Sequence, residues 1–470
     1  MAELNIEALK MVPSIDPSFV PAVKWNAAFR QLAAKTQDST KFVIALERKD
    51  STVSVFETVS LPHTDDYKEL NVKYVERLLK FLLWQKGGYK VYLAGNDALA
   101  ADIKAIYSET GSRAFDYEFM GEKVYGSAME FIIGDYAVVP EQKELAIPLG
   151  RNLDGNRIGF DLGGSDRKAA ALVDGKVVYS EEIEWDPYFE TDPQYHLDGI
   201  RDTLKKAAAH LPGGKIDAIG GSAAGVYVNN EVRVASLFRG VAHDDFEKVV
   251  RKIFFDLKDE FGGIPFEVVN DGEVTALAGS MSMNDNAVLG VSMGTSEAAG
   301  YVTPEGNINP WLNELAFAPV DYRENGPVDE WSGDIGCGVQ FFSQQGIARL
   351  IPLAGLDEVI DTTLPNPEKL IEVQKLMAAG DDRARKLYET VGVCFGYAVA
   401  HYAEFYDIKN LLILGRVTSG EGGEIIIQKA EEVLAAEYPA LAEAITMCTP
   451  DEKNKRHGQA VAAGSLPKIG

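Results

Sequence analysis

The sequence is poor in cysteine, and its few cysteines lie far apart. Among 470 residues there are three, Cys337, Cys394 and Cys448. Thiolate zinc sites and disulfide frameworks both require several cysteines at short, recurring spacings, so this pattern excludes both classes. A chain with so few thiols fits a reducing compartment, and we expect a cytoplasmic protein.

Long apolar runs are also missing from the sequence. No stretch of about eighteen apolar residues occurs, so we predict no membrane span. Residues 1–19 are mostly polar and contain no apolar segment of the kind that a signal peptide needs.

Positive charge is scarce. The chain has 46 Lys and Arg residues against 71 Asp and Glu residues, which gives a formal net charge of −25. Repulsion at this charge argues against nucleic acid and anionic membranes as partners. ATP remains compatible with the acidic chain, because a nucleotide site is local and usually brings Mg²⁺ with it.

Apolar residues, in contrast, make up 46% of the chain, which is enough for sizeable cores. The length predicts about three domains. We expect residues 1–150 to form an α/β domain of unknown role that begins with an irregular or helical arm. Residues 41–62 alternate like two strands, and residues 75–83 carry one apolar helical face. Two further α/β regions follow, residues 151–290 and 291–470.

The linker between the first two regions covers residues 140–157 and is rich in turn-forming residues. On either side of it, residues 42–94 and 158–221 share the order strand hairpin, helix, strand. This likeness leaves two alternatives open, a degenerate duplication or a chance similarity between small α/β units. The first copy lacks the glycines of the second, so its turn would not let backbone amides approach a phosphate.

The first segment with chemical character is a strand that ends in a glycine turn. Asp161 lies at the end of this predicted buried strand and is followed by Gly163, Gly164 and Ser165. Two glycines let backbone N–H groups approach phosphate oxygens without a Cβ in the way. The carboxylate of Asp161 can hold hydrated Mg²⁺. The alternative is an ordinary hairpin.

Two later strands also end in small-residue turns. One leads into a turn of Gly294, Thr295 and Ser296, the last two of which carry hydroxyl groups. This turn could face the turn at Gly163 and Gly164, so that the two bind a polyphosphate from opposite sides. The other, residues 411–414, opens at Gly415 ahead of a predicted helix. A flat glycine turn beside a helix N-terminus suits a nucleoside.

A fourth segment places a carboxylate where a buried strand meets a helix. Asp271 follows the strand that ends at Asn270. Phosphoryl transfer to an alcohol needs a group that takes the hydroxyl proton, and Asp271 is well placed for that role. A helix N-cap is an equally good interpretation of the same residue.

Taken in order, these segments resemble the ROK family (repressors, open reading frames and kinases) of the ASKHA superfamily, which includes actin, Hsp70 and hexokinase. The resemblance covers roughly residues 157–465. It implies a two-lobed, ribonuclease H-like α/β fold with mixed sheets, and an extra N-terminal α/β domain that the family does not explain. It also implies ATP and Mg²⁺ as cofactors, bound in a cleft between the lobes.

The resemblance assigns roles to individual residues. Asp271 is the implied catalytic base, and Asp161 holds Mg²⁺ through water. Asn270 and Glu314 are the implied residues that hydrogen-bond the substrate hydroxyls. Ser236 lies near the position of an asparagine in the family's sugar loop and is a further implied substrate residue. The implied nucleotide-binding residues are Gly163, Gly164, Ser165, Gly294, Thr295, Ser296 and, beside the adenosine, Gly415.

Several residues depart from the family pattern. The family's sugar-contact histidine falls on Phe317, which cannot form a hydrogen bond. The cysteine cluster that binds structural zinc in the family keeps only Cys337, so we predict no zinc site. Glu297 stands where the family prefers glycine, and its charge would repel a triphosphate unless it points away or reaches Mg²⁺. The histidines show no ligand spacing, and we expect surface or capping positions for His196, His210, His243, His401 and His457.

The sequence therefore predicts an ATP-dependent kinase that phosphorylates a hydroxyl of a sugar, polyol or similar small molecule. A different class stays open, a non-catalytic protein that senses a sugar or a nucleotide, which Glu297 and Phe317 favour. A third interpretation is a scaffold whose N-terminal domain mediates self-association, for example as a homodimer.

Overall fold

The computed structural model describes residues 2–144, 149–449 and 452–469, and for residues 452–457 it describes the backbone alone. Part of the predicted linker, residues 145–148, lies outside the described residues. The chain divides into two compact units. Unit 1 consists of Met1–Leu145, Val291–Ala299 and Trp311–Cys448, and unit 2 consists of Ala146–Gly290, Gly300–Pro310 and Thr449–Gly470.

Unit 2 is built on a five-stranded mixed sheet in the order β11-β8-β5-β6-β7. The strands β5, β6 and β7 form an antiparallel meander, whereas β8 and β11 run parallel to β5. Both β5 and β8 are buried along nearly their whole length, as expected for strands covered on both faces. Their bounds are β5 Asn156–Leu162, β6 Asp166–Val173, β7 Lys176–Glu184, β8 Ala218–Ala223 and β11 Phe266–Asn270.

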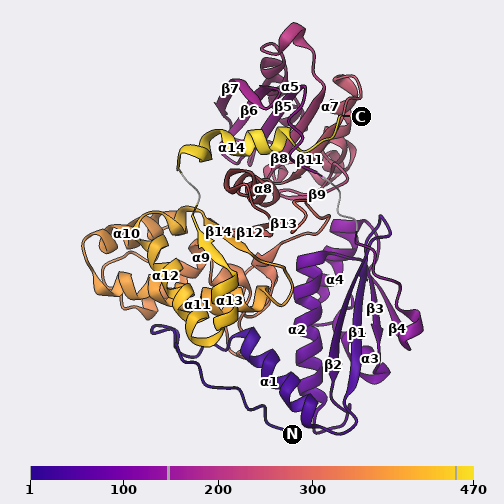
Figure 1. Ribbon diagram of the computed structural model, residues 1–470, viewed down its shortest axis with the longest axis vertical. Coiled ribbons are helices and arrows are strands. Elements are labelled where there is room, and N and C mark those ends of the chain that lie inside the picture. The colour runs from indigo at the N-terminus through magenta and orange to yellow at the C-terminus, as the bar shows by residue number, and fades with distance from the viewer. Residues whose placement is uncertain (1, 145–148, 450–451, 470) are drawn as a thin grey trace. The chain divides into compact units, whose positions relative to one another are not determined.

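Helices cover this sheet. Figure 1 shows α14, the yellow helix near the C-terminus, lying across the strands of unit 2. It approaches closely because Gly159 and Gly220 have no side chain: a Cβ on either would collide with the backbone carbonyl of Ala460 or Ala463. The helices of unit 2 are α5 Pro193–Ala208, α6 His243–Lys248, α7 Ile253–Glu260, α8 Asp271–Met283 and α14 Glu452–Gly464. A small hairpin, β9 Val226–Val228 and β10 Glu231–Val234, follows β8.

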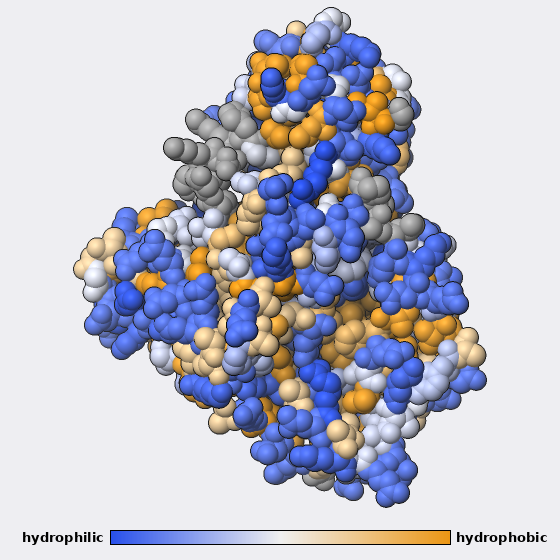
Figure 2. All heavy atoms as spheres, viewed as in Figure 1, coloured by the Kyte–Doolittle hydropathy of each residue, from blue (hydrophilic) through white to orange (hydrophobic). Residues whose placement is uncertain are grey.

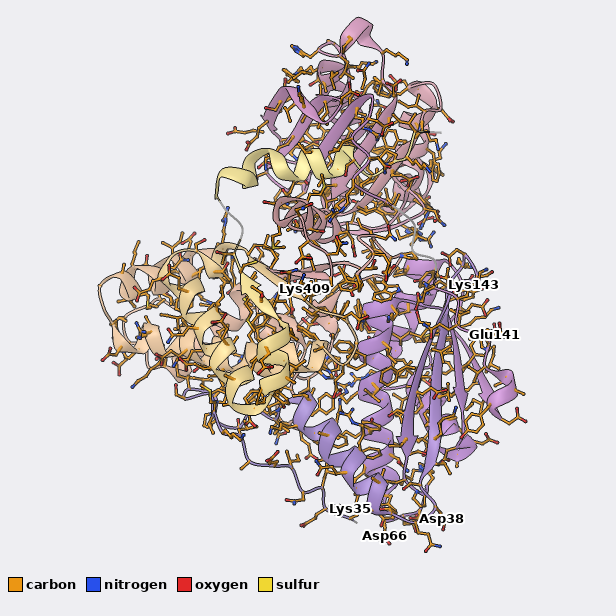
Figure 3. The ribbon with its side chains drawn as sticks, in the orientation of Figure 1. Lys35, Asp38, Asp66, Glu141, Lys143 and Lys409 are labelled. Atoms are coloured by element: carbon orange, nitrogen blue, oxygen red, sulfur yellow. The ribbon has the colours of Figure 1, made fainter. Side chains whose placement is uncertain are left out.

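Unit 1 begins with an extended arm and a four-stranded sheet in the order β2-β1-β3-β4. The long helix α2 lies beside this sheet in Figure 1. Figure 3 labels Asp38, which has a φ of 63° in the turn between α1 and β1, and Lys143, whose backbone pairs with Val53 of β2. The elements are α1 Ala22–Lys35, β1 Thr40–Glu47, β2 Val53–Ser60, α2 Lys68–Lys86, β3 Lys90–Ala94, α3 Asp97–Ile106, α4 Ala114–Glu118, a π-helix Phe119–Tyr125 and β4 Glu130–Gly134.

The two strands predicted at 41–62 and the helix predicted around 75–83 are thus confirmed as β1, β2 and α2. The suggested duplication is not supported by the strand directions. In the N-terminal sheet β3 runs antiparallel to β1, whereas in unit 2 the corresponding strand β8 runs parallel to β5. The two regions share an order of elements but not a topology.

The rest of unit 1 contains helices and strands from a second sheet, which has the order β13-β12-β14-β15. The helices α11 and α12 pack closely because Gly392 and Gly396 of α11 face the α12 backbone at Ile426 and Ala430. The elements that lie partly in unit 1 are β12 Val288–Met293 and β13 Glu297–Val302. Those that lie wholly in it are α9 Gln344–Leu353, α10 Asn366–Ala378, α11 Asp382–Tyr402, β14 Asn410–Leu414, α12 Glu421–Glu437, α13 Pro439–Ala444 and β15 Thr446–Cys448.

The N-terminal arm is anchored to unit 1 by buried charge. The carboxylate of Asp16 is buried and pairs with Arg323 and with Arg349, at 2.5 Å and 2.8 Å.

The face of the molecule in Figure 2 is largely hydrophilic, as the charged composition predicts. None of the helices in the described ranges combines the length and apolar character needed to cross a membrane.

Candidate functional site

Asp161 and Asp271 lie at the same edge of the unit 2 sheet. Asp161 is the second-last residue of β5 and pairs in register with Ser222 of β8, which in turn pairs with Val269 of β11. Asp271 follows β11 directly. Because β5, β8 and β11 are parallel, their carboxyl ends bring the two carboxylates together, as in other open α/β sheets.

The surroundings of these carboxylates raise both of their pKa values. Asp161 is only 8% exposed, and burial raises its pKa. Burial together with the negative charge of Asp161 raises the pKa of Asp271 to about 6. A carboxylate with a pKa close to the working pH is effective as a general base, because it is ionised yet still basic.

The helix cap beside Asp271 is made by its neighbour. The side-chain oxygen of Asn270 accepts a hydrogen bond from the Gly272 amide at 2.7 Å, and its amide group donates to the Gly225 carbonyl at 2.7 Å. Asp271 accepts from the same Gly272 amide at 3.0 Å. Asn270 is therefore the N-cap of α8, and the N-cap interpretation of Asp271 is wrong.

The first glycine turn links β5 to β6. The Gly163 amide donates to the Asp166 carbonyl at 2.9 Å, so this N–H serves the hairpin. The amides of Gly164 and Ser165 remain as the donors that a phosphate could use within the described part of the turn. A pocket of about 600 Å³ borders the turn and has an acidic lining that includes Asp166 and Glu184. Such a lining suits a phosphate only when a cation accompanies it.

The second turn, in unit 1, holds Gly294, Thr295 and Ser296. The Gly294 amide donates to the Ser296 carbonyl, and the Gly294 carbonyl accepts from the Gln344 amide at the start of α9, both at 2.9 Å. Thr295 and Ser296 are exposed. The turn is thus pinned by backbone hydrogen bonds while its two hydroxyl groups face solvent.

Glu297, directly after this turn, points into the interior. Its side chain is 2% exposed and lies 3.4 Å from the Tyr402 hydroxyl, which donates to it. Burial, together with the nearby Glu314 carboxylate, raises the pKa of Glu297 to about 8. The residue is therefore neutral at pH 7 and faces away from the exposed hydroxyls, so it does not repel a phosphate at the turn.

Gly415 lies against the end of the strand that carries the second turn. Its φ is 105°, and a Cβ at this position would collide with the backbone of Met293. Only glycine satisfies both conditions. The turn predicted to face an adenosine is therefore held next to Met293, one residue before Gly294.

The predicted substrate residue Glu314 is contacted by the N-terminal helix α2. The Glu314 amide donates to the Trp84 carbonyl at 2.9 Å, and the adjacent Asn313 amide donates to the Gln85 carbonyl at 3.0 Å. The rings of Trp84 and Phe317 lie 4.4 Å apart. Sequence reasoning missed Trp84 and Gln85, because nothing in a helical apolar face indicates which distant segment it contacts. Ser236, the other predicted substrate residue, is exposed in unit 2.

No protein-family model matches the sequence, and no curated protein matches it significantly. Solved structures do match. The ROK hexokinase from Thermus thermophilus aligns with a TM-score of 0.52 and 17% identity, over 66% of this chain and 96% of that one. A ROK transcriptional regulator, a homologue of the E. coli MLC protein, aligns with a TM-score of 0.50 and 18% identity, over 70% of this chain and 82% of that one.

This chain has the ROK fold. The α/β architecture with mixed sheets that the sequence predicted is therefore confirmed. At this level of identity the likeness shows the fold alone, because one fold can host many activities. About a third of the chain lies beyond the match to the hexokinase.

Close to the positions where the resemblance to the ROK family implies zinc ligands, this chain has a network of ion pairs. Its cations Lys80 and Arg77 come from α2. Lys80 lies 2.8 Å from Asp116 and 3.2 Å from Asp334, and Arg77 lies 3.1 Å from Asp334. The Cys337 thiol donates to Asp334 at 3.6 Å and is fully buried, which raises its pKa. Within the described ranges, no group of three or more His, Cys, Asp or Glu residues is arranged to hold a metal.

The prediction that the histidines occupy surface or capping positions is wrong for His401 and His196. His401 is buried among the rings of Phe81 and Phe405, and burial lowers its pKa to about 3. His196 is fully buried, with its Nε2 atom 3.0 Å from two backbone carbonyls. Both lie on the inward faces of helices, where packing decides their position. His210 and His243 are exposed, and the side chain of His457 lies outside the described residues.

Proposed function

We propose that this chain is a member of the ROK family and an ATP-dependent kinase that phosphorylates a hydroxyl group of a sugar or sugar-like small molecule. The observation that carries the proposal is Asp271. It lies at the carboxyl edge of a parallel sheet, next to Asp161, with a pKa of about 6 and with the capping role taken by Asn270. These are the properties of a general base.

The residues present fit a magnesium nucleotide. Unused backbone amides at Gly164 and Ser165 suit phosphate oxygens, and the buried Asp161 carboxylate suits the water shell of Mg²⁺, which keeps several waters when it binds protein. When bound, Mg·ATP supplies the phosphoryl group. Gly294, Thr295 and Ser296 are proposed to hold phosphate oxygens as well, and the turn at Gly415 to contact the adenosine.

On the substrate side, Asp271 takes the proton from the hydroxyl that becomes phosphorylated. Glu314 accepts hydrogen bonds from further hydroxyl groups, in a segment fixed by the carbonyl of Trp84. Asn270 is already engaged on both sides by Gly272 and Gly225, so it has one remaining N–H for a substrate oxygen. Ser236 offers an exposed hydroxyl. Missing any such partner is costly, which gives a site of this kind its specificity.

The test is an ADP-release assay with Mg·ATP and a panel of sugars, polyols and amino sugars. We expect turnover with at least one of them. The Asp271→Asn variant should bind Mg·ATP as the native protein does and lose about 10²- to 10⁴-fold in turnover. Asp256→Asn, which changes an exposed aspartate of the same unit, is the matched control. Undiminished turnover in Asp271→Asn would remove this residue from the mechanism.

A second candidate is a sensor that binds a sugar or a nucleotide without transfer. The shared fold with a ROK transcriptional regulator favours it. A sensor would show a thermal shift with Mg·ATP or with a sugar but no ADP release across the panel. A scaffold that associates through the N-terminal domain would show neither response, and light scattering would report its dimer.

A further inference from the structure

A loop rich in aromatic residues lies over the first glycine turn of unit 2. The Trp185 indole donates to the Gly163 carbonyl at 2.8 Å, and the Trp185 amide donates to the Ser165 carbonyl at 3.1 Å. Three residues later, the Tyr188 hydroxyl occupies the space in which a side chain on Gly164 would stand. The loop of residues 185–190 is therefore fixed onto the turn at three points.

The same loop is fastened to the segment that carries the predicted substrate residue Ser236. The buried His196 ring places Nε2 3.0 Å from the Pro187 carbonyl and 3.0 Å from the Leu237 carbonyl. Gly240 permits a close approach, because a Cβ there would lie 2.5 Å from the Glu190 carbonyl. Residues 185–190 thus connect the phosphate turn with the segment 236–240.

Arg239 stands at this junction and is held by aromatic rings. Its guanidinium carbon lies 4.1 Å from the centre of the Tyr188 ring and 5.1 Å from that of Phe189. Among the described residues Arg239 has no carboxylate within ion-pair distance. Five other arginines of unit 2 pair with carboxylates, namely Arg157, Arg167, Arg201, Arg233 and Arg251.

Stacking on rings leaves the donors of a guanidinium unused. The interaction of Arg239 with Tyr188 and Phe189 acts through the ring faces, so the five N–H groups stay available for an anion. Simple surface packing is a weak explanation, because Phe189 is 74% exposed and an exposed cation–π contact contributes only about 0.5–1 kcal/mol. A positive charge kept free in an acidic chain points to an anionic ligand.

We propose that the Arg239 guanidinium binds the terminal phosphoryl group of Mg·ATP, with the Tyr188 hydroxyl as a second donor. This inference rests on the proposed kinase function. The phosphoryl group that passes from nucleotide to substrate must lie between the phosphate turn and the substrate segment, and Tyr188 and Arg239 occupy that junction. A guanidinium there forms paired hydrogen bonds with phosphoryl oxygens and stabilises charge during transfer. The acidic pocket beside the turn selects the magnesium complex over free ATP.

Calorimetric titration with Mg·ATP and Mg·ADP tests this assignment on the full-length protein. We expect Arg239→Gln to weaken Mg·ATP binding by about 10- to 100-fold and to leave Mg·ADP binding unchanged, because ADP lacks the terminal group. The Tyr188→Phe variant should weaken Mg·ATP binding by a smaller factor. The control is Arg201→Gln, which changes a half-buried arginine of the same unit that pairs with carboxylates, and both affinities should stay unchanged there.

The outcomes distinguish a failure of the proposed Arg239 role from a failure of the proposed kinase function. Unchanged Mg·ATP affinity in Arg239→Gln, or an equal loss for Mg·ADP, overturns the role of Arg239 while leaving the kinase proposal intact. A native protein that binds neither nucleotide overturns the kinase proposal itself. If Arg239→Gln does not fold, Arg239→Lys replaces it, since lysine keeps the charge but lacks the planar fork, and it should show a smaller loss that is again confined to ATP.

Discussion

Replacing Glu297 by glutamine tests whether the carboxyl group behind the second phosphate turn is neutral. In the folded protein its pKa is about 8 instead of 4.5, because the side chain is buried and Glu314 lies nearby. Glutamine has nearly the same shape and carries no charge at any pH. The substitution therefore removes the titration and keeps the packing against Tyr402.

The sign and size of the effect follow from these two pKa values. Between pH 4.5 and pH 8 the unfolded chain releases the Glu297 proton and the folded chain retains it, so rising pH favours unfolding. Over that window the native protein should lose about 5 kcal/mol of stability through this residue, and the loss should level off above pH 8. Glu297→Gln should match the native protein near pH 4.5, apart from about 1 kcal/mol for the altered hydrogen bond to Tyr402. At pH 8 it should be the more stable of the two.

Urea unfolding at pH 5, 6.5 and 8 measures this difference through tryptophan fluorescence. Four of the five tryptophans belong to unit 1, so the signal reports mainly the unit that contains Glu297. Glu305→Gln, at an exposed position, is the matched control and should follow the native protein at each pH. A stability difference that stays constant from pH 5 to pH 8 would mean that Glu297 is ionised in the native state. A negative charge would then stand directly behind the turn of Gly294, and the account of phosphate binding there would fail.

Three further predictions concern the proposed site and its support. The kcat/KM of the native enzyme should rise with pH through about 6, as Asp271 loses its proton, and a flat profile from pH 5 to 8 would argue against this base. Trp84→Ala should destabilise unit 1 by about 3–5 kcal/mol and lower kcat/KM by about 10- to 100-fold. The reason is that Phe317, in the segment that follows Glu314, loses the ring on which it packs, although the backbone carbonyl at position 84 is kept. Denaturation and ADP-release assays measure the two effects. Lys80→Met should cost about 3–5 kcal/mol by leaving the buried Asp116 without its cationic partner, while Asp334 keeps Arg77. A chelator should leave the melting temperature of the native protein unchanged.

Local patterns were enough to place the two carboxylates of unit 2 each at the end of a strand. Asp161 lies near the end of a buried strand and Asp271 directly follows another, and parallel strands present their carboxyl ends at one edge. The turn at Gly415 was predictable for a similar reason, since a buried strand that breaks at glycine must change direction there. In each case the information lies within about ten residues of the site.

Contacts between distant segments could not be predicted in this way. Arg77 and Lys80 lie on a helix whose charged residues resemble a solvated face, yet both are buried against Asp334, which is more than 250 residues away in the chain. A single sequence does not show which surface covers a helix. The same limit explains His401, which packs on Phe81 of the distant helix α2.

The departures from the family pattern become intelligible once α2 is taken into account. Phe317, at the position where the resemblance implies a histidine, packs on Trp84, and Asp334, close to the implied zinc positions, pairs with Lys80 and Arg77 of the same helix. A tetrahedral metal and a buried ion-pair network both fix a loop, but only the network requires a second element to be present. The segment at Glu314 and the loop around Asp334 therefore both depend on α2, and the N-terminal domain is expected to be required for any activity that depends on Glu314.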